Sequence, residues 1–184
     1  MGFFTKMLLF GIGGVVLIIV LASAGSRGTK KEGNPDQTKE GAKASAKIGD
    51  EIQFGGDSTW VVLAAEDKGT AITSNNPLQQ DAQTTGRFIL VHFKVTNLGK
   101  KEQRIVNTPK LIDSQQREFK NYDHQTFYIP KGGETMTGKA IPASLAKEFY
   151  AVYEVPPDAK GLRFQTRDLS SSFTPDFKLV DLGF

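Results

Sequence analysis

Apolar and polar positions alternate with a period of two over much of this chain, and the pattern is clearest between Arg87 and Thr96. One face of that segment carries four large apolar residues, Ile89, Val91, Phe93 and Val95. The opposite face begins with two apolar residues and ends with three polar ones, Phe88, Leu90, His92, Lys94 and Thr96. This pattern predicts a β-strand whose second face is partly covered near its start and solvated near its end.

Ten further short segments are predicted as strands, at 51–54, 59–65, 70–73, 103–106, 110–113, 118–122, 134–141, 149–155, 162–166 and 177–182. Clusters of Gly, Pro, Asn and Asp separate many of them, including the clusters at 66–69 and 97–100, and these residues favour turns. The turn at 97–100 predicts a hairpin that joins 87–96 to 103–106. Helical periodicity is confined to about one turn at 143–148. Many short strands without a long helix predict an all-β sandwich of two sheets over residues 48–184.

An apolar run of 18 residues without a charge extends from Met7 to Ala24. As an α-helix it would be roughly 27 Å long at ~1.5 Å per residue, close to the ~30 Å hydrocarbon core of a bilayer. A helix buried in a globular domain would show a polar face, and this run shows none. We therefore expect residues 1–25 to form one N-terminal transmembrane helix, which binds the membrane through residues 7–24.

The same run also fits a cleaved signal peptide, because Ala22-Ser23-Ala24 satisfies the small-residue rule for cleavage. Its length exceeds the ~7–15 apolar residues usual in such peptides, which favours an uncleaved anchor. The charges around the run conflict with export. Arg27, Lys30 and Lys31 follow the run and only Lys6 precedes it, so the positive-inside rule alone would place the C-terminal side in the cytoplasm.

Residues 26–47 have the composition of a flexible linker, rich in Gly, Lys, Ser and Thr, with no apolar side chain apart from Ala. Such a segment cannot bury enough surface to offset the entropy lost on ordering, so we expect it to be disordered. A flexible chain of that length spans on average about 26 Å. The linker would therefore hold residues 48–184 clear of the lipid headgroups.

Charge and composition restrict the chemistry of the predicted domain. The net charge of +3 divides into +4 for residues 1–47 and −1 for residues 48–184, so the domain lacks the basic patch of a nucleic-acid binder. The chain has no Cys, which excludes disulfides, thiolate zinc sites, a cysteine nucleophile and a lipid-modified N-terminal Cys. With two histidines, His92 and His124, a site built on several histidines is excluded within one chain. We predict no cofactor.

Six blocks occur in order between residues 47 and 184: KIGD, GRFILVHFKVTNLGKKEQRI, KLIDSQQREF, IPKGGETMTGKAIPAS, FYAVYEVPPDAKGLRFQ and FKLVDLGF. In this order they resemble the telokin-like, immunoglobulin-fold domain family of bacterial cell-envelope proteins, a domain of unknown function. The chain departs from the family pattern at Gln115-Gln116, which stands in place of an Asp-Gly turn. The resemblance implies an immunoglobulin-like β-sandwich, export, a binding or supporting role and no shared catalytic residues. In this family a lipoprotein signal or one membrane segment commonly precedes the domain; without a Cys, the apolar run must be the anchor itself or be removed.

Candidate catalytic and metal-binding groups are few. No serine lies in a G-x-S-x-G motif, and His124 is the one candidate base, although an exposed loop histidine is the simpler interpretation. We interpret His92, in the middle of a strand, as a half-buried packing residue. Asp123 and His124, with Asp113 or Glu118, could supply ligands for a divalent metal, but no calcium-loop motif is present. We predict that the protein is not an enzyme.

The segment 119–130, FKNYDHQTFYIP, combines aromatic residues with adaptable polar ones, as recognition loops do. Its candidate binding residues are Tyr122, Asp123, His124, Phe127 and Tyr128. The alternative interpretation is that Phe127 and Tyr128 open a strand and point into the core. A second loop, 169–175, could contribute to the same surface, and the lone Trp60 is predicted to fill the core.

These observations predict an extracytoplasmic, membrane-tethered, non-catalytic binding domain of the bacterial cell envelope, with a protein or envelope component as its partner. The alternative is a secreted soluble domain, released by cleavage near Ala24, that binds a small ligand or a divalent metal. The sequence identifies neither the partner nor the oligomeric state.

Overall fold

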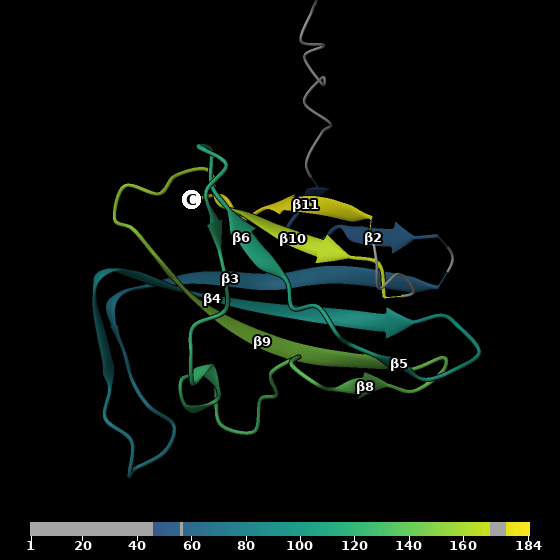
Figure 1. Cartoon of the computed structure of the whole chain (residues 1–184), viewed down its shortest axis with the longest axis horizontal. Helices are drawn as coiled ribbons and strands as arrows, with labels where there is room; N and C mark the ends of the chain where they lie inside the picture. Colours follow the sequence, from purple (N-terminus) through teal and green to yellow (C-terminus); the bar gives the residue numbers. More distant parts are fainter. Residues whose placement is uncertain (1–45, 56, 170–175) are drawn as a thin grey trace, which may run out of the picture. The chain divides into compact units, whose positions relative to one another are not determined.

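The structure is a computed structural model that describes residues 46–55, 57–169 and 176–184 (Figure 1). Its strands are β1 (Ala46–Lys47), β2 (Glu51–Phe54), β3 (Ser58–Ile72), β4 (Ala82–Asn97), β5 (Gln103–Arg104), β6 (Lys110–Ile112), β7 (Glu118–Phe119), β8 (Ala140–Ile141), β9 (Ala146–Val155), β10 (Arg163–Arg167) and β11 (Phe177–Asp181), with one 3-10 helix, η1 (Gln125–Phe127). The described residues therefore form an all-β fold. Strand β1 uses the last two residues of the predicted linker.

The predicted membrane segment, residues 7–24, and the linker up to residue 45 lie outside the described residues. Within the described ranges, no helix combines the length and the apolar character needed to cross a bilayer.

The strands form two larger sheets and one short ribbon (Figure 1). The five-stranded sheet has the order β1-β11-β10-β6-β7, the four-stranded sheet has the order β2-β3-β4-β9, and β5 pairs with β8. Neighbouring strands are antiparallel except β1, which runs parallel to β11. Side chains from both larger sheets meet in one hydrophobic core, so the alternation in the sequence correctly predicted a sandwich-like fold.

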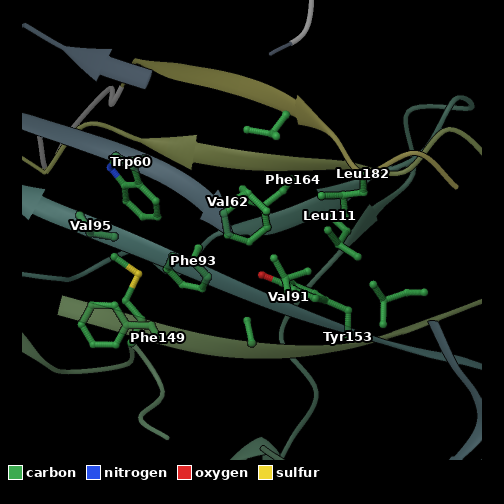
Figure 2. Close-up of a cluster of buried hydrophobic side chains, with 14 of the residues drawn as sticks. Trp60, Val62, Val91, Phe93, Val95, Leu111, Phe149, Tyr153, Phe164 and Leu182 are labelled. Atoms are coloured by element: carbon green, nitrogen blue, oxygen red, sulfur yellow. The ribbon is translucent and has the colours of Figure 1, made fainter. Parts of the chain in front are cut away.

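Large aromatic side chains fill the core between the two larger sheets (Figure 2). Trp60 of β3 stacks on Phe93 of β4 with ring centroids 5.6 Å apart, and Phe164 of β10 lies 5.0 Å from the same Phe93 ring. Trp60 is only 1% exposed, which confirms its predicted place in the core. Burying each such side chain stabilises the fold by about 1.5–3 kcal/mol.

Strand β4 separates this core from a second hydrophobic cluster on the outer face of its sheet. Ile89, Val91, Phe93 and Val95 belong to the core, whereas Phe88 and Leu90 belong to the second cluster. Farther along the outer face, the half-buried His92 stacks on Tyr150 of β9 with ring centroids 4.2 Å apart, and its Nε2 lies 2.9 Å from Glu148 Oε2. The predicted change from a covered to a solvated outer face is therefore confirmed, and so is the packing role of His92.

The turn predicted at 66–69 is wrong. These residues lie inside β3, which extends over 15 residues and pairs with β4 as far as Ile72. The ladder contains register shifts that mark β-bulges, and in one of them the N–H of Gly69 donates a hydrogen bond to Asp67 Oδ1 at 2.9 Å. Gly69 has a φ of +70°, so the Asp-Lys-Gly signal marks a bulge in a long strand.

The hairpin predicted between 87–96 and 103–106 is also wrong, because both edges of β4 are occupied by β3 and β9, and β5 pairs with β8. The buried Asn97 fixes the position of the turn that follows β4. Its Nδ2 donates hydrogen bonds to the carbonyl oxygens of Lys101 at 2.8 Å and Ile141 at 2.9 Å, and its Oδ1 accepts one from the N–H of Gly99 at 2.9 Å. These bonds place the turn after β4 next to β8.

Two further predictions near β9 need correction. The segment 134–141 contains a strand only at β8, and the helical turn predicted at 143–148 is absent from the described residues. Ser144 has a φ of +59°, and β9 begins two residues later and pairs with β4 along its whole length. The burial of Phe149, Ala151 and Tyr153 along this ladder outweighs the local helical preference.

Candidate functional site

Residues 121–136, called the covering segment below, lie along the free edge of β9 and over the second hydrophobic cluster. The N–H of Tyr122 donates a hydrogen bond to the carbonyl oxygen of Val152 at 2.7 Å, and the N–H of Tyr150 donates one to the carbonyl oxygen of Glu134 at 2.8 Å. These bonds satisfy backbone groups of an edge strand that would otherwise be open to another chain. In Figure 1 the segment is the irregular stretch below β9 that contains the small helix.

A buried glutamine completes this attachment. Gln125, 7% exposed, accepts a hydrogen bond from the N–H of Val152 at 3.0 Å through its Oε1, which also accepts one from Asn121 Nδ2 at 3.2 Å. The residue before it, His124, has a φ of +58° and leads the chain into η1. The covering segment is therefore bound to β9 through both its backbone and a buried side chain.

The aromatic residues predicted to bind a partner lie together on the inner side of the covering segment. Tyr128 is buried, and Tyr122 and Phe127 are partly buried against the second hydrophobic cluster. The Tyr122 ring lies 5.1 Å from Phe88 and 5.8 Å from Tyr128, centroid to centroid, both in edge-to-face arrangements. These three rings attach the covering segment to the sheet.

The phenol groups differ in their surroundings. The hydroxyl of Tyr128 donates a hydrogen bond to the carbonyl oxygen of Gln80 at 3.1 Å and accepts one from Gln79 Nε2 at 3.2 Å. Burial raises the pKa of Tyr122, and the nearby ionisable groups of Tyr128, Glu154 and Asp123 raise it further. Tyr122 therefore keeps its proton well above neutral pH.

The polar members of the predicted site have a different exposure. Asp123 and His124 are exposed to solvent, as is Thr126 two residues farther on. The His124 ring lies over Phe127 with centroids 6.4 Å apart. The five predicted residues, all within 122–128, therefore differ in orientation: the aromatic ones face the sheet, and Asp123 and His124 face solvent.

Asn75, in the loop between β3 and β4, is a positioning residue that sequence reasoning missed. Its N–H donates a hydrogen bond to the carbonyl oxygen of Phe127 at 2.7 Å, and its Nδ2 donates to the carbonyl oxygens of Thr126 at 3.1 Å and Ile129 at 2.8 Å. These bonds fix η1 from a second side. The Ser-Asn-Asn-Pro stretch at 74–77 is typical of a loop, but nothing in it indicates a contact with residues 126–129.

A pocket with a volume of about 390 Å³ lies beside the covering segment. Four of its lining residues, Ile72, Leu90, Tyr128 and Ile129, are each at most 6% exposed, so they present little apolar surface to a ligand. Its rim includes Lys68 of β3, residues 73–75 and Lys131.

The structure does not assemble the metal ligands considered from the sequence. Asp113 Oδ2 accepts a hydrogen bond from Arg117 Nε at 2.6 Å, and Glu118 Oε2 lies 2.5 Å from Lys110 Nζ. Among the described residues, no three His, Asp or Glu side chains come close enough together to hold a metal ion.

Comparisons with known proteins support the fold alone. No family model and no curated protein matches the chain. Among solved structures it is similar to the yjhA protein from Bacillus subtilis, with 14% identity, a TM-score of 0.54, and coverage of 74% of this chain and 98% of that one. A conserved hypothetical protein from Bacillus anthracis has 10% identity, a TM-score of 0.53 and coverages of 73% and 94%. A functionally unknown protein from Listeria monocytogenes has 13% identity, a TM-score of 0.53 and coverages of 74% and 83%. At such identities the likeness says nothing of a ligand or an activity.

Proposed function

We propose that this protein is a membrane-tethered, non-catalytic binding domain that is displayed outside the cytoplasmic membrane of a bacterium. The apolar run at 7–24 supports the tether, and the linker at 26–47 supports display away from the lipid surface. The sequence resemblance supports an immunoglobulin-like domain of the telokin-like family and an envelope location. The similarity to bacterial structures of the same fold is compatible with this proposal.

The observation that carries the binding role is the way in which the covering segment is held. Its backbone is fixed by β9, Gln125 and Asn75, while Asp123, His124 and Thr126 remain exposed. A loop that is ordered before binding loses less conformational entropy when a partner docks on it. An exposed polar loop on a rigid β scaffold is also where binding residues are commonly found. The partner would be a protein or another envelope component that contacts these three residues.

Site-specific photo-crosslinking on intact cells tests the binding role. A photoreactive amino acid is placed at the exposed Thr126 and, as a matched control, at the exposed Ser114 in the turn between β6 and β7. We expect an adduct from position 126 that is absent from position 114. Asp123→Ala with His124→Asn, which retains a residue type that tolerates positive φ, should abolish that adduct. Identical adducts from both positions, or adducts insensitive to the double variant, would contradict the proposal.

The location is tested separately by adding protease to whole cells. We expect cleavage of the domain without lysis, and protection until lysis would place the domain inside. The mass of the mature protein distinguishes the anchor from the alternative, a secreted domain that starts at Gly25. In either case the binding surface described above would be the same.

A further inference from the structure

Two segments that are remote in sequence, 98–106 and 138–147, lie side by side at the C-terminal end of β4 (Figure 1). Strand β5 of the first segment pairs antiparallel with β8 of the second. Asn97, the last residue of β4, is bound to both, because its Nδ2 donates hydrogen bonds to the carbonyl oxygens of Lys101 and Ile141. The two segments together are called the basic end below.

The basic end concentrates positive charge. It carries five cations and one anion, whereas residues 48–184 as a whole have a net charge of −1. Two acidic residues lie nearby: Glu134 is 3.7 Å from Lys139, and the carbonyl oxygen of Asp57 accepts a hydrogen bond from the N–H of Leu98 at 2.8 Å. The other four cations form no ion pair within the ranges that the structure describes: Lys100, Lys101, Arg104 and Lys147. The overall charge of the domain therefore does not indicate this local concentration.

Exposed apolar side chains are concentrated at the same end. Of the six large apolar side chains that are exposed in the described part of the chain, three belong to the basic end, namely Leu98, Val106 and Leu145, with exposed fractions of 45%, 74% and 55%. The N–H of Asn97, next to Leu98, donates a hydrogen bond to the carbonyl oxygen of Leu145 at 2.9 Å. Cations around exposed aliphatic groups suit an anionic membrane surface, where the cations meet the headgroups and the apolar groups enter the boundary with the acyl chains.

We propose that the basic end docks on the anionic lipid surface of the membrane that anchors the chain. Such docking rests on the proposed function, because it requires the membrane tether. A flexible linker sets only an average distance of about 26 Å, so it also permits the domain to reach the headgroups. It supplies an effective concentration in the millimolar range, so even weak docking would be populated. A soluble anionic polymer would use the cations but would leave the three aliphatic side chains without a partner.

Fluorescence quenching in vesicles tests the docking. The chain has no Cys, so the full-length protein, inserted through residues 7–24, takes a dye at one introduced cysteine. Ala146→Cys places the dye at the basic end, and Ser114→Cys, in the turn between β6 and β7, is the control; both positions are exposed. The vesicles consist of phosphatidylcholine alone or in equal parts with phosphatidylglycerol, and a small share of the lipids carries a quencher on the headgroup. We expect quenching at position 146 in the anionic vesicles only, and its loss at high salt.

Charge variants and an apolar variant separate the two contributions. Lys100→Gln with Lys101→Gln should reduce the ratio of docked to free domain by at least about fivefold, because each cation near an anionic membrane contributes about that factor. Lys120→Gln with Lys160→Gln removes the same charge from exposed positions outside the basic end and should have little effect. Leu145→Gln should also weaken the quenching, because it removes an apolar group from the contact with lipid.

The outcomes distinguish the docking from the tether. Quenching that does not depend on phosphatidylglycerol, equal quenching at positions 146 and 114, or equal effects of the two lysine pairs would overturn the docking. Loss of the quenching when soluble polyphosphate is added, at a phosphate concentration well below that of the anionic lipid, would assign the basic end to a soluble polymer and would also overturn it. A chain that floats with phosphatidylcholine vesicles but shows no quenching in the anionic ones lacks the docking alone. A chain that does not float with them lacks the tether, and the proposed function then fails together with the docking.

Discussion

The side-chain carbonyl of Gln125 accepts a hydrogen bond from the backbone N–H of Val152 at 3.0 Å. Through this bond a buried glutamine takes the place of a neighbouring strand at the edge of β9. It also positions η1, which carries the exposed residues of the proposed binding surface. One contact therefore serves both the protection of a sheet edge and the presentation of the candidate site.

Replacing Gln125 should destabilise the domain. Gln125→Ala leaves the buried N–H of Val152 without an acceptor, which costs about 1–3 kcal/mol of the free energy of unfolding. The measurement is urea denaturation followed by the fluorescence of Trp60, the single tryptophan of the chain. Thr126→Ala, at the exposed neighbour, is the control and should change the free energy by less than about 0.5 kcal/mol. Equal midpoints for the two variants would show that the bond to Val152 contributes nothing.

A second prediction concerns Gly86, which lies in the N-terminal part of β4, before the residues of that strand that belong to the core. A Cβ at this position would lie 2.3 Å from the carbonyl oxygen of Val155 in β9, closer than two such atoms approach. We expect Gly86→Ala to reduce the free energy of unfolding by about 3 kcal/mol, because the two strands must separate.

Gly132→Ala provides the comparison for Gly86. Gly132 has a φ of +85°, and a Cβ at this position would have no atom within 4 Å, so its replacement introduces backbone strain alone. That strain costs about 1–2 kcal/mol. If Gly86→Ala were no more destabilising than Gly132→Ala in the same urea titration, the close approach of β4 and β9 would be wrong.

The strands of the core could be predicted because burial imposes a period of two over many residues. In 87–96 the alternation identified both the core face and the covered start of the outer face, and Trp60 was correctly placed inside. The pairing of strands could not be read from the same pattern. Whether 103–106 pairs with β4 depends on which strands occupy its edges, and those contacts are remote in sequence.

The sequence proposed which residues form the candidate site but did not indicate how they are oriented. Aromatic and polar residues alternate irregularly in 119–130, and the alternative in which Phe127 and Tyr128 point inward is the one that matches the structure, although they lie in and just after η1 and not in a strand. The structure turns Tyr122 and Tyr128 toward the second cluster and leaves Asp123 and His124 outside. This division arises from bonds to Val152 and Asn75, which lie 27 and more residues away along the chain.

A third prediction follows from the turn in which the chain departs from the family it resembles. Gln116 has a φ of +63° in the turn between β6 and β7, a conformation that suits the glycine of an Asp-Gly turn. Gln116→Gly should therefore stabilise the domain by roughly 0.5–1 kcal/mol, because relief of the strain exceeds the added entropy of the unfolded chain. Gln115→Gly, at the neighbouring residue without a positive φ, should be destabilising in the same titration. A loss of stability in Gln116→Gly would contradict the left-handed conformation.

The last prediction concerns pH and the buried carboxylate of Asp113, which accepts hydrogen bonds from the backbone of the same turn. Burial raises the pKa of Asp113, but hydrogen bonds from the N–H and Nε of Arg117 and from the N–H of Gln115 outweigh it, so the pKa lies below its ordinary value of 3.8. A carboxyl with a lowered pKa in the folded state stabilises that state above the ordinary value, and this contribution is lost as the pH falls through the lowered one. Asp113→Asn should therefore be less stable than the parent chain at pH 7, and the difference in unfolding midpoint should shrink steadily below about pH 4. Asp158→Asn is a suitable comparison, because Asp158 also faces Arg117 but is largely exposed, and its ion pair at 3.3 Å should contribute much less. A pH-independent difference between the parent chain and Asp113→Asn would show that the side chain acts through shape and hydrogen bonding, and that its charge has no part in holding the turn.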